Sequence, residues 1–513
     1  MNILQLEDIN LQGELGERAL LLAERLEGPE YRPESIFSED VSGWPADWEG
    51  RTILALTLIS QLTKKEAKYL NGIIEELKRN LNEKGYLKEI LPDEQFNEQQ
   101  LSGHSWMLRG LIEFYNWTRR DDVLEIIKSI VENLFLPTRG FYAKYPVKKE
   151  DRPSHGEKAG NVFGRKGNWF LSSDTCCVYI PIDGLSHAYE LLGDARILEL
   201  LEEMIENFVK IDLAGIQAQT HASLSATRGI LRTYGMTGEE KYLDAAIKIF
   251  DLYINEGMTA TFANYNWFGR PRWTEPCAII DSYIVANELF RYTSKSSYLD
   301  WAQKIWYNGV EHAQRQNGGF GCDSCAGAAG EIIEVSAYEA YWCCTMRGGE
   351  GLAKCAQYSY MIDKKDEIYV TMPQTSELEI QLSNGKITIK QSTGYPTLGS
   401  VRFEVIRKES GATQIPMHLY IPDWAQDVRV NEKVTGAKDG FLTFDLINGE
   451  ILVEFGIPDF EEKAFGKFNG DKSLKFRGNL ILGTTDKTDL LPINNTFKKS
   501  REQVESEKIQ VLY

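Results

Sequence analysis

The sequence of 513 residues contains no apolar run that approaches the roughly 20 residues of a membrane-spanning helix. Its start, MNILQLED, has neither the basic stretch nor the apolar core of a secretory signal. Basic residues are outnumbered, 57 lysines and arginines against 75 acidic residues, and they form no basic stripe. The formal net charge of −18 argues against nucleic acid as a partner. We therefore expect a cytoplasmic protein that binds neither membrane nor nucleic acid.

Histidine is also rare, with six residues, whereas eight cysteines are present. Cytoplasmic thiols stay reduced, so we do not expect disulfides to stabilise this chain. Clustered cysteines in a large chain of this kind instead indicate metal binding or catalysis. The cysteines are Cys176, Cys177, Cys277, Cys322, Cys325, Cys343, Cys344 and Cys355.

The chain is too long for one compact core, and its apolar pattern changes near residue 363. Before that point, about twelve segments show the helical period. Twelve helices in antiparallel pairs suit a closed (α/α)6 toroid. The segments are 15–26, 53–62, 69–81, 106–117, 123–134, 182–192, 197–209, 224–234, 242–254, 279–292, 298–313 and 351–360.

After residue 363, short runs rich in β-forming residues are separated by turn residues such as Lys438-Asp439-Gly440. Such a series is typical of an all-β sandwich. Residues 3–11 also alternate as a strand does. We predict a multidomain α+β protein: residues 1–12 form a strand that joins the β domain, residues 13–362 form the (α/α)6 toroid, and residues 363–513 form a β-sandwich with a polar C-terminal tail.

Three long segments, 137–173, 256–274 and 317–342, interrupt the helical pattern. Long loops in a compact domain are commonly functional, and these are rich in aromatic residues. We interpret them as ordered loops around a pocket, where a ring such as that of Trp273 can stack on a sugar. Each single aromatic residue is, however, more often simply buried.

Two motifs carry the strongest chemical signal, Trp342-Cys343-Cys344-Thr345 and Glu275-Pro276-Cys277. Adjacent cysteines do not easily bridge each other, but both thiolates can reach one soft metal ion. Three thiolates and one carboxylate would complete a tetrahedral zinc site. Two other interpretations stay open: a cysteine often packs as a small apolar side chain, and Cys322-x-x-Cys325 would complete a four-cysteine site with the Cys343-Cys344 pair, leaving Glu275 free.

On several short motifs, in order from about Trp44 to Leu482, the chain resembles glycoside hydrolase family 127, the β-L-arabinofuranosidase family. The resemblance implies a toroid that acts on a carbohydrate. The motifs are Ser102-Gly103-His104, Glu275-x-Cys277-Ala278, Tyr298-x-Asp300 with Trp306-Tyr307-Asn308-Gly309, Cys343-Cys344, Gln391-x-Thr393-x-Tyr395-Pro396 and Leu419-Tyr420-Ile421-Pro422-x-Trp424.

The resemblance also implies roles for individual residues. Zinc is expected to bind to Glu275, Cys277, Cys343 and Cys344. Cys343 is expected to act as the nucleophile of a retaining mechanism, in place of one of the two usual carboxylates. The substrate-binding candidates are His104, Asp183, His221 and Trp273; for each histidine a purely structural role is an equal alternative.

The sequence departs from the family pattern at the expected sugar pocket. Residues 257–264 contain no carboxylate where the family has its acid/base glutamate. Glu256 is the nearest acid and our candidate for that role, although the end of a helix would also explain it. Thr345-Met346-Arg347 follows the cysteine pair in place of Pro-Pro-Asn, and Asp183 occupies the position of a family histidine.

These observations support a glycosidase that acts on a neutral sugar. A non-catalytic or regulatory sugar-binding protein that lost the acid/base glutamate is the alternative. A lyase or an epimerase is a third hypothesis, which rests on analogy of fold alone.

Overall fold

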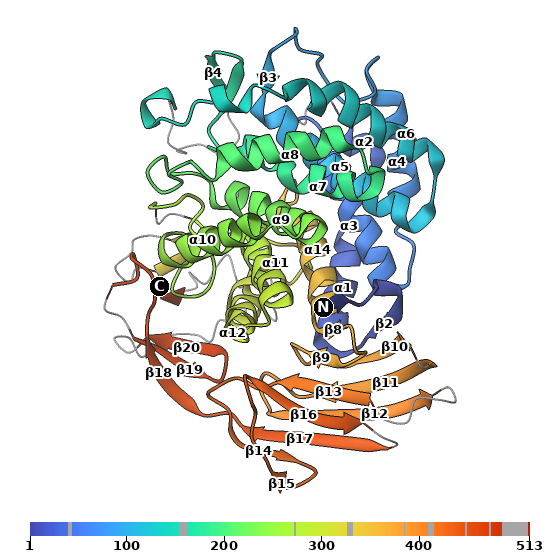
Figure 1. The fold of residues 1–513 in the computed structure, drawn as a ribbon, viewed down its shortest axis with the longest axis vertical. Helices are drawn as coiled ribbons and strands as arrows, with labels where there is room; N and C mark the ends of the chain where they lie inside the picture. The colour runs from blue at the N-terminus through green and yellow to red at the C-terminus, as the bar shows by residue number, and fades with distance from the viewer. Residues whose placement is uncertain are drawn as a thin grey trace.

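The computed structural model describes residues 1–38, 44–152, 162–270, 273–325, 332–383, 385–408, 415–446, 449–470, 473–484 and 511–512. Helices fill the upper part of the molecule in Figure 1, and the orange to red strands lie beneath them. This order of a helical domain followed by β-sheets confirms the predicted fold class. In the described part of the chain, no helix combines the length and the apolar character needed to cross a membrane.

Six helices form a closed inner ring, in which each helix packs against the next and α14 packs back against α3. Each of them also packs against at least one helix of an outer layer, and α3 and α11 each pack against two. The inner helices are α3 (Asp47–Thr63), α5 (Glu98–Thr118), α7 (Pro181–Leu192), α9 (Thr220–Thr237), α11 (Pro276–Thr293) and α14 (Cys344–Tyr358). The outer helices are α1 (Gly13–Arg25), α4 (Leu70–Asn80), α6 (Asp121–Ile130), α8 (Ala195–Phe208), α10 (Glu240–Glu256) and α12 (Ser297–Lys304). Two short helices, α2 (Pro33–Ile36) and α13 (Glu311–Ala313), lie between these elements.

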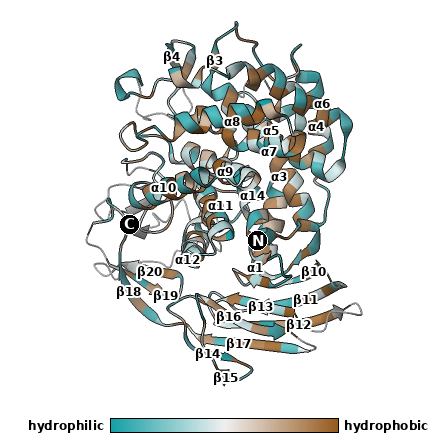
Figure 2. Ribbon diagram, viewed as in Figure 1, coloured by the Kyte–Doolittle hydropathy of each residue, from teal (hydrophilic) through white to brown (hydrophobic). Residues whose placement is uncertain are grey.

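The helices of the inner ring pack closely because glycines occupy positions where the helices cross. A Cβ atom on Gly50 of α3 would lie 2.2 Å from the backbone nitrogen of Met107 in α5, and one on Gly110 would lie 2.5 Å from the Gly50 carbonyl oxygen. The outer helices bury one face only, as Figure 2 indicates by brown and teal segments that alternate along them. That difference explains why the helical period is clearest in the outer helices.

Two larger sheets form the β domain, and the rings of Phe403 and Phe444, one from each sheet, lie 5.6 Å apart between them. Their strand orders are β1-β8-β9-β13-β16 and β15-β14-β17-β12-β11-β10-β2. The strands are β1 (Asn2–Ile3), β2 (Ile9–Leu11), β8 (Tyr360–Ile362), β9 (Ile368–Val370), β10 (Ser376–Leu382), β11 (Gly385–Thr393), β12 (Ser400–Lys408), β13 (Ile415–Tyr420), β14 (Gln426–Val430), β15 (Lys433–Val434), β16 (Phe441–Leu446) and β17 (Glu450–Gly456). A third sheet contains β18 (Asp459–Lys463), β19 (Ser473–Arg477) and β20 (Leu480–Thr484).

The N-terminal segment contains two strands where the sequence predicts one. A short 3-10 helix, Leu6–Asp8, separates β1 from β2, so the segment pairs with β8 in one sheet and with β10 in the other. The predicted division of the chain at residues 12 and 363 stays a prediction of domain organisation.

Small sheets also lie in two of the segments predicted as loops. One contains β3 (Phe96–Asn97), β4 (Val162–Lys166) and β5 (Trp169–Ser172). The other contains β6 (Cys322–Cys325), β7 (Ile332–Ala337) and β21 (Val511–Leu512). β3 and β21 pair with strands that are distant in the sequence, and local patterns do not reveal such pairing, whereas β4 and β5 form a local hairpin.

A buried network of charges crosses the interior of the ring. We call Arg109, Asp183, Arg228, Asp281, Arg347 and Glu350 the ring network. Arg109 donates to Glu350 at 2.7 Å and to Asp183 at 3.1 Å, and Arg228 donates to Asp281 at 2.7 Å. Arg228 and Arg347 also bond to Glu350, and Arg347 bonds to Asp281. The network therefore connects five of the six inner helices.

Replacing Glu350 by glutamine should destabilise the protein strongly. Three guanidinium groups would then share the interior with two carboxylates, and removing one partner from a buried ion pair costs about 3–5 kcal/mol. Urea unfolding followed by circular dichroism measures the change. The control is Asp459→Asn, which breaks an exposed pair with Arg477 and should leave the midpoint unchanged. Equal midpoints for the two variants would show that the ring network does not stabilise the fold.

Candidate metal centre

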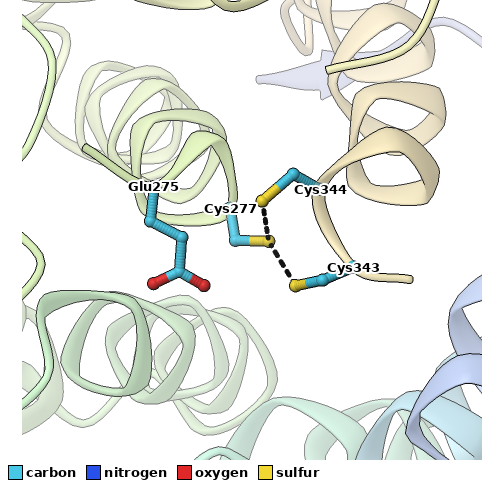
Figure 3. Close-up of side chains that lie close together, drawn as sticks. All are labelled: Glu275, Cys277, Cys343 and Cys344. Atoms are coloured by element: carbon cyan, nitrogen blue, oxygen red, sulfur yellow. Dashed lines mark hydrogen bonds between the residues drawn. The ribbon is translucent and has the colours of Figure 1, made fainter. Parts of the chain in front are cut away.

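Glu275, Cys277, Cys343 and Cys344 lie together at the starts of two neighbouring inner helices (Figure 3). Glu275 immediately precedes α11, and Pro276 at the first helical position favours a helix start there. Cys343 immediately precedes α14, and Cys344 is its first residue. The Sγ atom of Cys277 lies 3.3 Å from that of Cys343 and 3.7 Å from that of Cys344. The structure thus brings together the four residues predicted as metal ligands.

The four side chains fit a tetrahedral metal ion. One ligand atom from each lies within 4.8 Å of the other three. In a zinc site with Zn–S bonds of about 2.3 Å, neighbouring sulfur atoms are about 3.8 Å apart, which is close to the observed spacing. All three cysteines are free of disulfides. Helix N-termini also favour negative charge, so the starts of α11 and α14 suit thiolate ligands.

Charge is distributed unevenly over the cluster. Contacts with the sulfur atoms of Cys277 and Cys344, together with nearby Arg51 and His221, hold the pKa of Cys343 well below its ordinary value. Burial raises the pKa of Glu275 well above its ordinary value, and the charge of Cys343 adds to that shift. In the metal-free cluster, Cys343 therefore carries the negative charge.

Arg51 of α3 joins the cluster to its surroundings, and the sequence analysis did not identify it. Its Nη1 donates to Cys277 Sγ at 3.5 Å, its Nη2 lies 3.3 Å from His221 Nε2, and its Nε donates to Asp47 Oδ2 at 2.7 Å. The guanidinium group stacks on the ring of Trp106. The sequence pattern predicted this helix only from residue 53, so that Asp47 and Arg51 fell outside it.

Two of the predicted substrate-binding residues lie beside the cluster. His221 contacts Arg51, and its Nδ1 lies 2.7 Å from Asp281 Oδ2. Asn266 links Trp273 to Glu275. In the amide orientation that satisfies both ends of the Asn266 side chain, the amide oxygen accepts from Trp273 Nε1 at 3.0 Å and the amide nitrogen donates to the Glu275 carboxylate.

The structure does not bring His104 and Asp183 to the cluster. His104 is buried, its Nε2 accepts from the backbone N–H of Leu87 at 3.1 Å, and its Nδ1 lies 2.8 Å from the carbonyl oxygen of Gln100. Both of its ring nitrogens thus contact the backbone. Asp183 belongs to the ring network, where it pairs with Arg109.

Glu256, the candidate acid/base, ends the outer helix α10. Its Oε2 accepts from Lys467 Nζ at 3.2 Å, and it is not part of the cysteine cluster. Cys322 lies closer, with its Sγ atom 3.9 Å from that of Cys344, but it does not belong to the group of four either. The side chain of Cys325 lies outside the described part of the structure.

A family model described as the catalytic domain of GH127 β-L-arabinofuranosidase matches residues 52–357, and the model of the GH127 middle domain matches residues 367–445. The chain belongs to the GH127 family of glycoside hydrolases. The family resemblance and the enzyme class inferred from the sequence are therefore confirmed.

Solved GH127 structures share the fold. A GH127 β-arabinofuranosidase is 16% identical, with a TM-score of 0.69, and the match covers 94% of this chain and 84% of that one. A GH127 β-L-arabinofuranosidase from Geobacillus stearothermophilus T6 is 15% identical, with a TM-score of 0.66 and coverage of 92% and 86%. A search of curated proteins found no match.

In metal-free protein, iodoacetamide should alkylate Cys343 faster than Cys355 at about pH 7. The lowered pKa of Cys343 leaves its thiolate already formed, whereas burial raises the pKa of Cys355. The rate at Cys343 should therefore change little up to about pH 9, as measured by mass spectrometry of the labelled peptides. A rate that rises about tenfold per pH unit would contradict the lowered pKa.

Proposed function

We propose that this GH127 protein is a retaining glycosidase for a neutral sugar of the β-L-arabinofuranoside class, with a zinc-bound Cys343 as nucleophile. One observation carries the proposal: the thiolate-prone Cys343 lies within a group of three sulfur atoms and one carboxylate. The substrate class comes from the family and from the printed names of the solved GH127 structures.

Bound zinc would keep the sulfur atoms of the cluster anionic. The Cys343 sulfur attacks the anomeric carbon, and the bond from that carbon to the leaving oxygen breaks while an acid gives this oxygen a proton. A water molecule then attacks the same carbon. The deprotonated acid takes a proton from that water, and the sugar and the Cys343 thiolate are released.

Asp47 is the side chain that we assign as this acid. It is buried, and Oδ1 has no hydrogen-bond partner among the residues that the structure describes. Burial raises its pKa to about 6; Arg51 opposes that shift and the nearby Cys343 charge adds to it. A carboxyl group with a pKa near the working pH suits proton transfer. Cys343 is only partly buried, and Trp342, directly before it, is 51% exposed.

A sugar-binding protein without catalysis is the second candidate. Residues 257–264 contribute Asn264, which binds the backbone N–H of Glu275 at 2.7 Å, but no carboxylate. If Asp47 does not replace the missing glutamate, the site could still hold a metal ion and a sugar but would lack the acid for natural glycosides.

Purified protein should contain one zinc ion per chain, measured by elemental mass spectrometry. Cys344→Ser should lose the metal and melt at a lower temperature, because a structural metal contributes its binding energy to folding. Cys355→Ser is the matched control, since Cys355 is a buried cysteine of the same helix outside the cluster. If the parent carries no metal and added zinc does not raise its melting temperature, the assigned site is wrong.

Activity on a nitrophenyl glycoside should vanish in Cys343→Ala. Asp47→Asn should lower kcat/KM by roughly 10²–10⁴-fold on alkyl glycosides but leave kcat/KM nearly normal on the nitrophenyl substrate, whose leaving group needs little protonation. Kinetics with both substrates measure this difference.

Glu256→Gln is the control for the acid and should behave like the parent on both substrates. If it is slow on alkyl glycosides alone, Glu256 is the acid and our assignment of Asp47 fails. A Cys343→Ala protein that still hydrolyses the nitrophenyl glycoside would rule out the thiolate mechanism. A parent that binds the sugar in calorimetry but hydrolyses neither substrate would establish the second candidate.

A further inference from the structure

A cavity of about 370 Å³ lies at the other end of the ring, lined mainly by the C-terminal halves of the six inner helices, α3 included, and by residues of the N-terminal segment such as Gln5. None of the four cluster residues lines it. An adjoining hollow of about 540 Å³ shares Glu113 and His187 with it and includes Trp117, which is 40% exposed. The cavity is thus a second polar site, separate from the cysteine cluster.

Among the described residues that line this cavity, Lys354 of α14 is a cationic side chain with no carboxylate beside it. Only 8% of the residue is exposed, and its Nζ donates to Gln357 Oε1 at 2.8 Å. No carboxylate of the described residues lies within 4.0 Å of this ammonium group. Burial lowers its pKa to about 8; Glu113 opposes that shift, and the guanidinium groups of Arg109, Arg232 and Arg228 add to it. Lys354 therefore stays largely protonated at neutral pH, although a buried cation without a counterion is costly.

Polar atoms without hydrogen-bond partners also belong to residues that line this cavity. The Nε atoms of Arg228 and Arg232 are buried and have no hydrogen-bond partner in the described part of the chain. His187 Nε2 is also unpartnered, since its nearest carboxylate oxygen, on Asp183, lies 3.7 Å away. Buried polar groups are normally satisfied, so the two unsatisfied arginine donors of one cavity indicate a missing acceptor.

The carboxylates of the cavity do not supply that acceptor. Its lining contains four carboxylates and four cationic side chains, and each carboxylate already lies within 4.0 Å of an arginine. Glu190 pairs with Arg232 at 2.7 Å, and Glu288 pairs with Arg291 at 3.1 Å. Lys354 is the cation that remains.

We propose that this cavity binds a small oxyanion, either phosphate or the carboxylate of an acidic sugar, whose oxygen atoms accept hydrogen bonds from Lys354, Arg228 and Arg232. A neutral polyol would bring as many donors as acceptors and would leave Lys354 without a counterion. An oxyanion supplies both the negative charge and the acceptors, and charge-assisted hydrogen bonds of this kind are the strong ones. This site does not depend on the proposed glycosidase function.

Isothermal titration calorimetry of the full chain tests the proposal, with inorganic phosphate and galacturonate as probes and with galactose as the neutral analogue of galacturonate. One phosphate or one galacturonate per chain should bind, and galactose should not bind here. The dissociation constant should rise at least tenfold in Lys354→Met. Lys84→Met, which removes an exposed lysine, should bind like the parent.

Lys354→Met removes a buried, uncompensated charge, so without anion this variant should melt at or above the parent temperature. Loss of binding then reports on the site rather than on unfolding. If the variant nevertheless fails to fold, Arg232→Met is the second test and should also weaken binding. Tighter binding of galacturonate than of phosphate identifies a sugar acid as the ligand, and the reverse identifies phosphate. An unchanged dissociation constant in the folded variant, or no saturable binding of either probe, would overturn the proposal.

Discussion

The contact between α11 and α14 is the constraint on which the site depends. Both metal-ligand motifs stand at the starts of these helices, so the two pairs of ligands meet only if the helices pack closely and in register. Gly351 permits this approach, because a Cβ atom there would lie 3.0 Å from the side chain of Ile280. The ring network fixes the same helices from inside, through Asp281 on one and Glu350 on the other.

The ring also gives its two ends different chemistry. The cysteine cluster lies at the starts of inner helices, where the helix dipole favours anions such as a thiolate. Arg228, Arg232 and Lys354 lie toward the other end, where helix C-termini favour cations. Arg228 lines the cavity at that end of the ring and also donates to Asp281. Asp281 in turn contacts His221, which lies near the cysteines. The ring network therefore lies between the two ends of the ring and contributes residues to the surroundings of both.

The sequence predicted what short-range patterns encode. The helical period located α9 and α10, the β-forming runs located the strands after residue 363, and motif resemblance identified the four clustered ligands. The pattern could not reveal Arg51, because its partners Cys277 and His221 are adjacent only after the ring closes. It also could not show that the ring nitrogens of His104 are used by the backbone, since a motif fixes position along the chain and not the partners of a side chain.

Two buried aspartates near the cysteine cluster, Asp281 and Asp47, differ in pKa: one stays ionised and the other can carry a proton. Burial alone would raise the pKa of Asp281, but Arg347, Arg228 and His221 outweigh it and hold that pKa well below its ordinary range. Asp47 has a single arginine partner, Arg51, and lies near the charge of Cys343, so burial prevails and its pKa is about 6. The number of cations around each carboxylate thus decides its role. Asp281 is held ionised and can orient His221, whereas Asp47 can hold a proton close to Cys343.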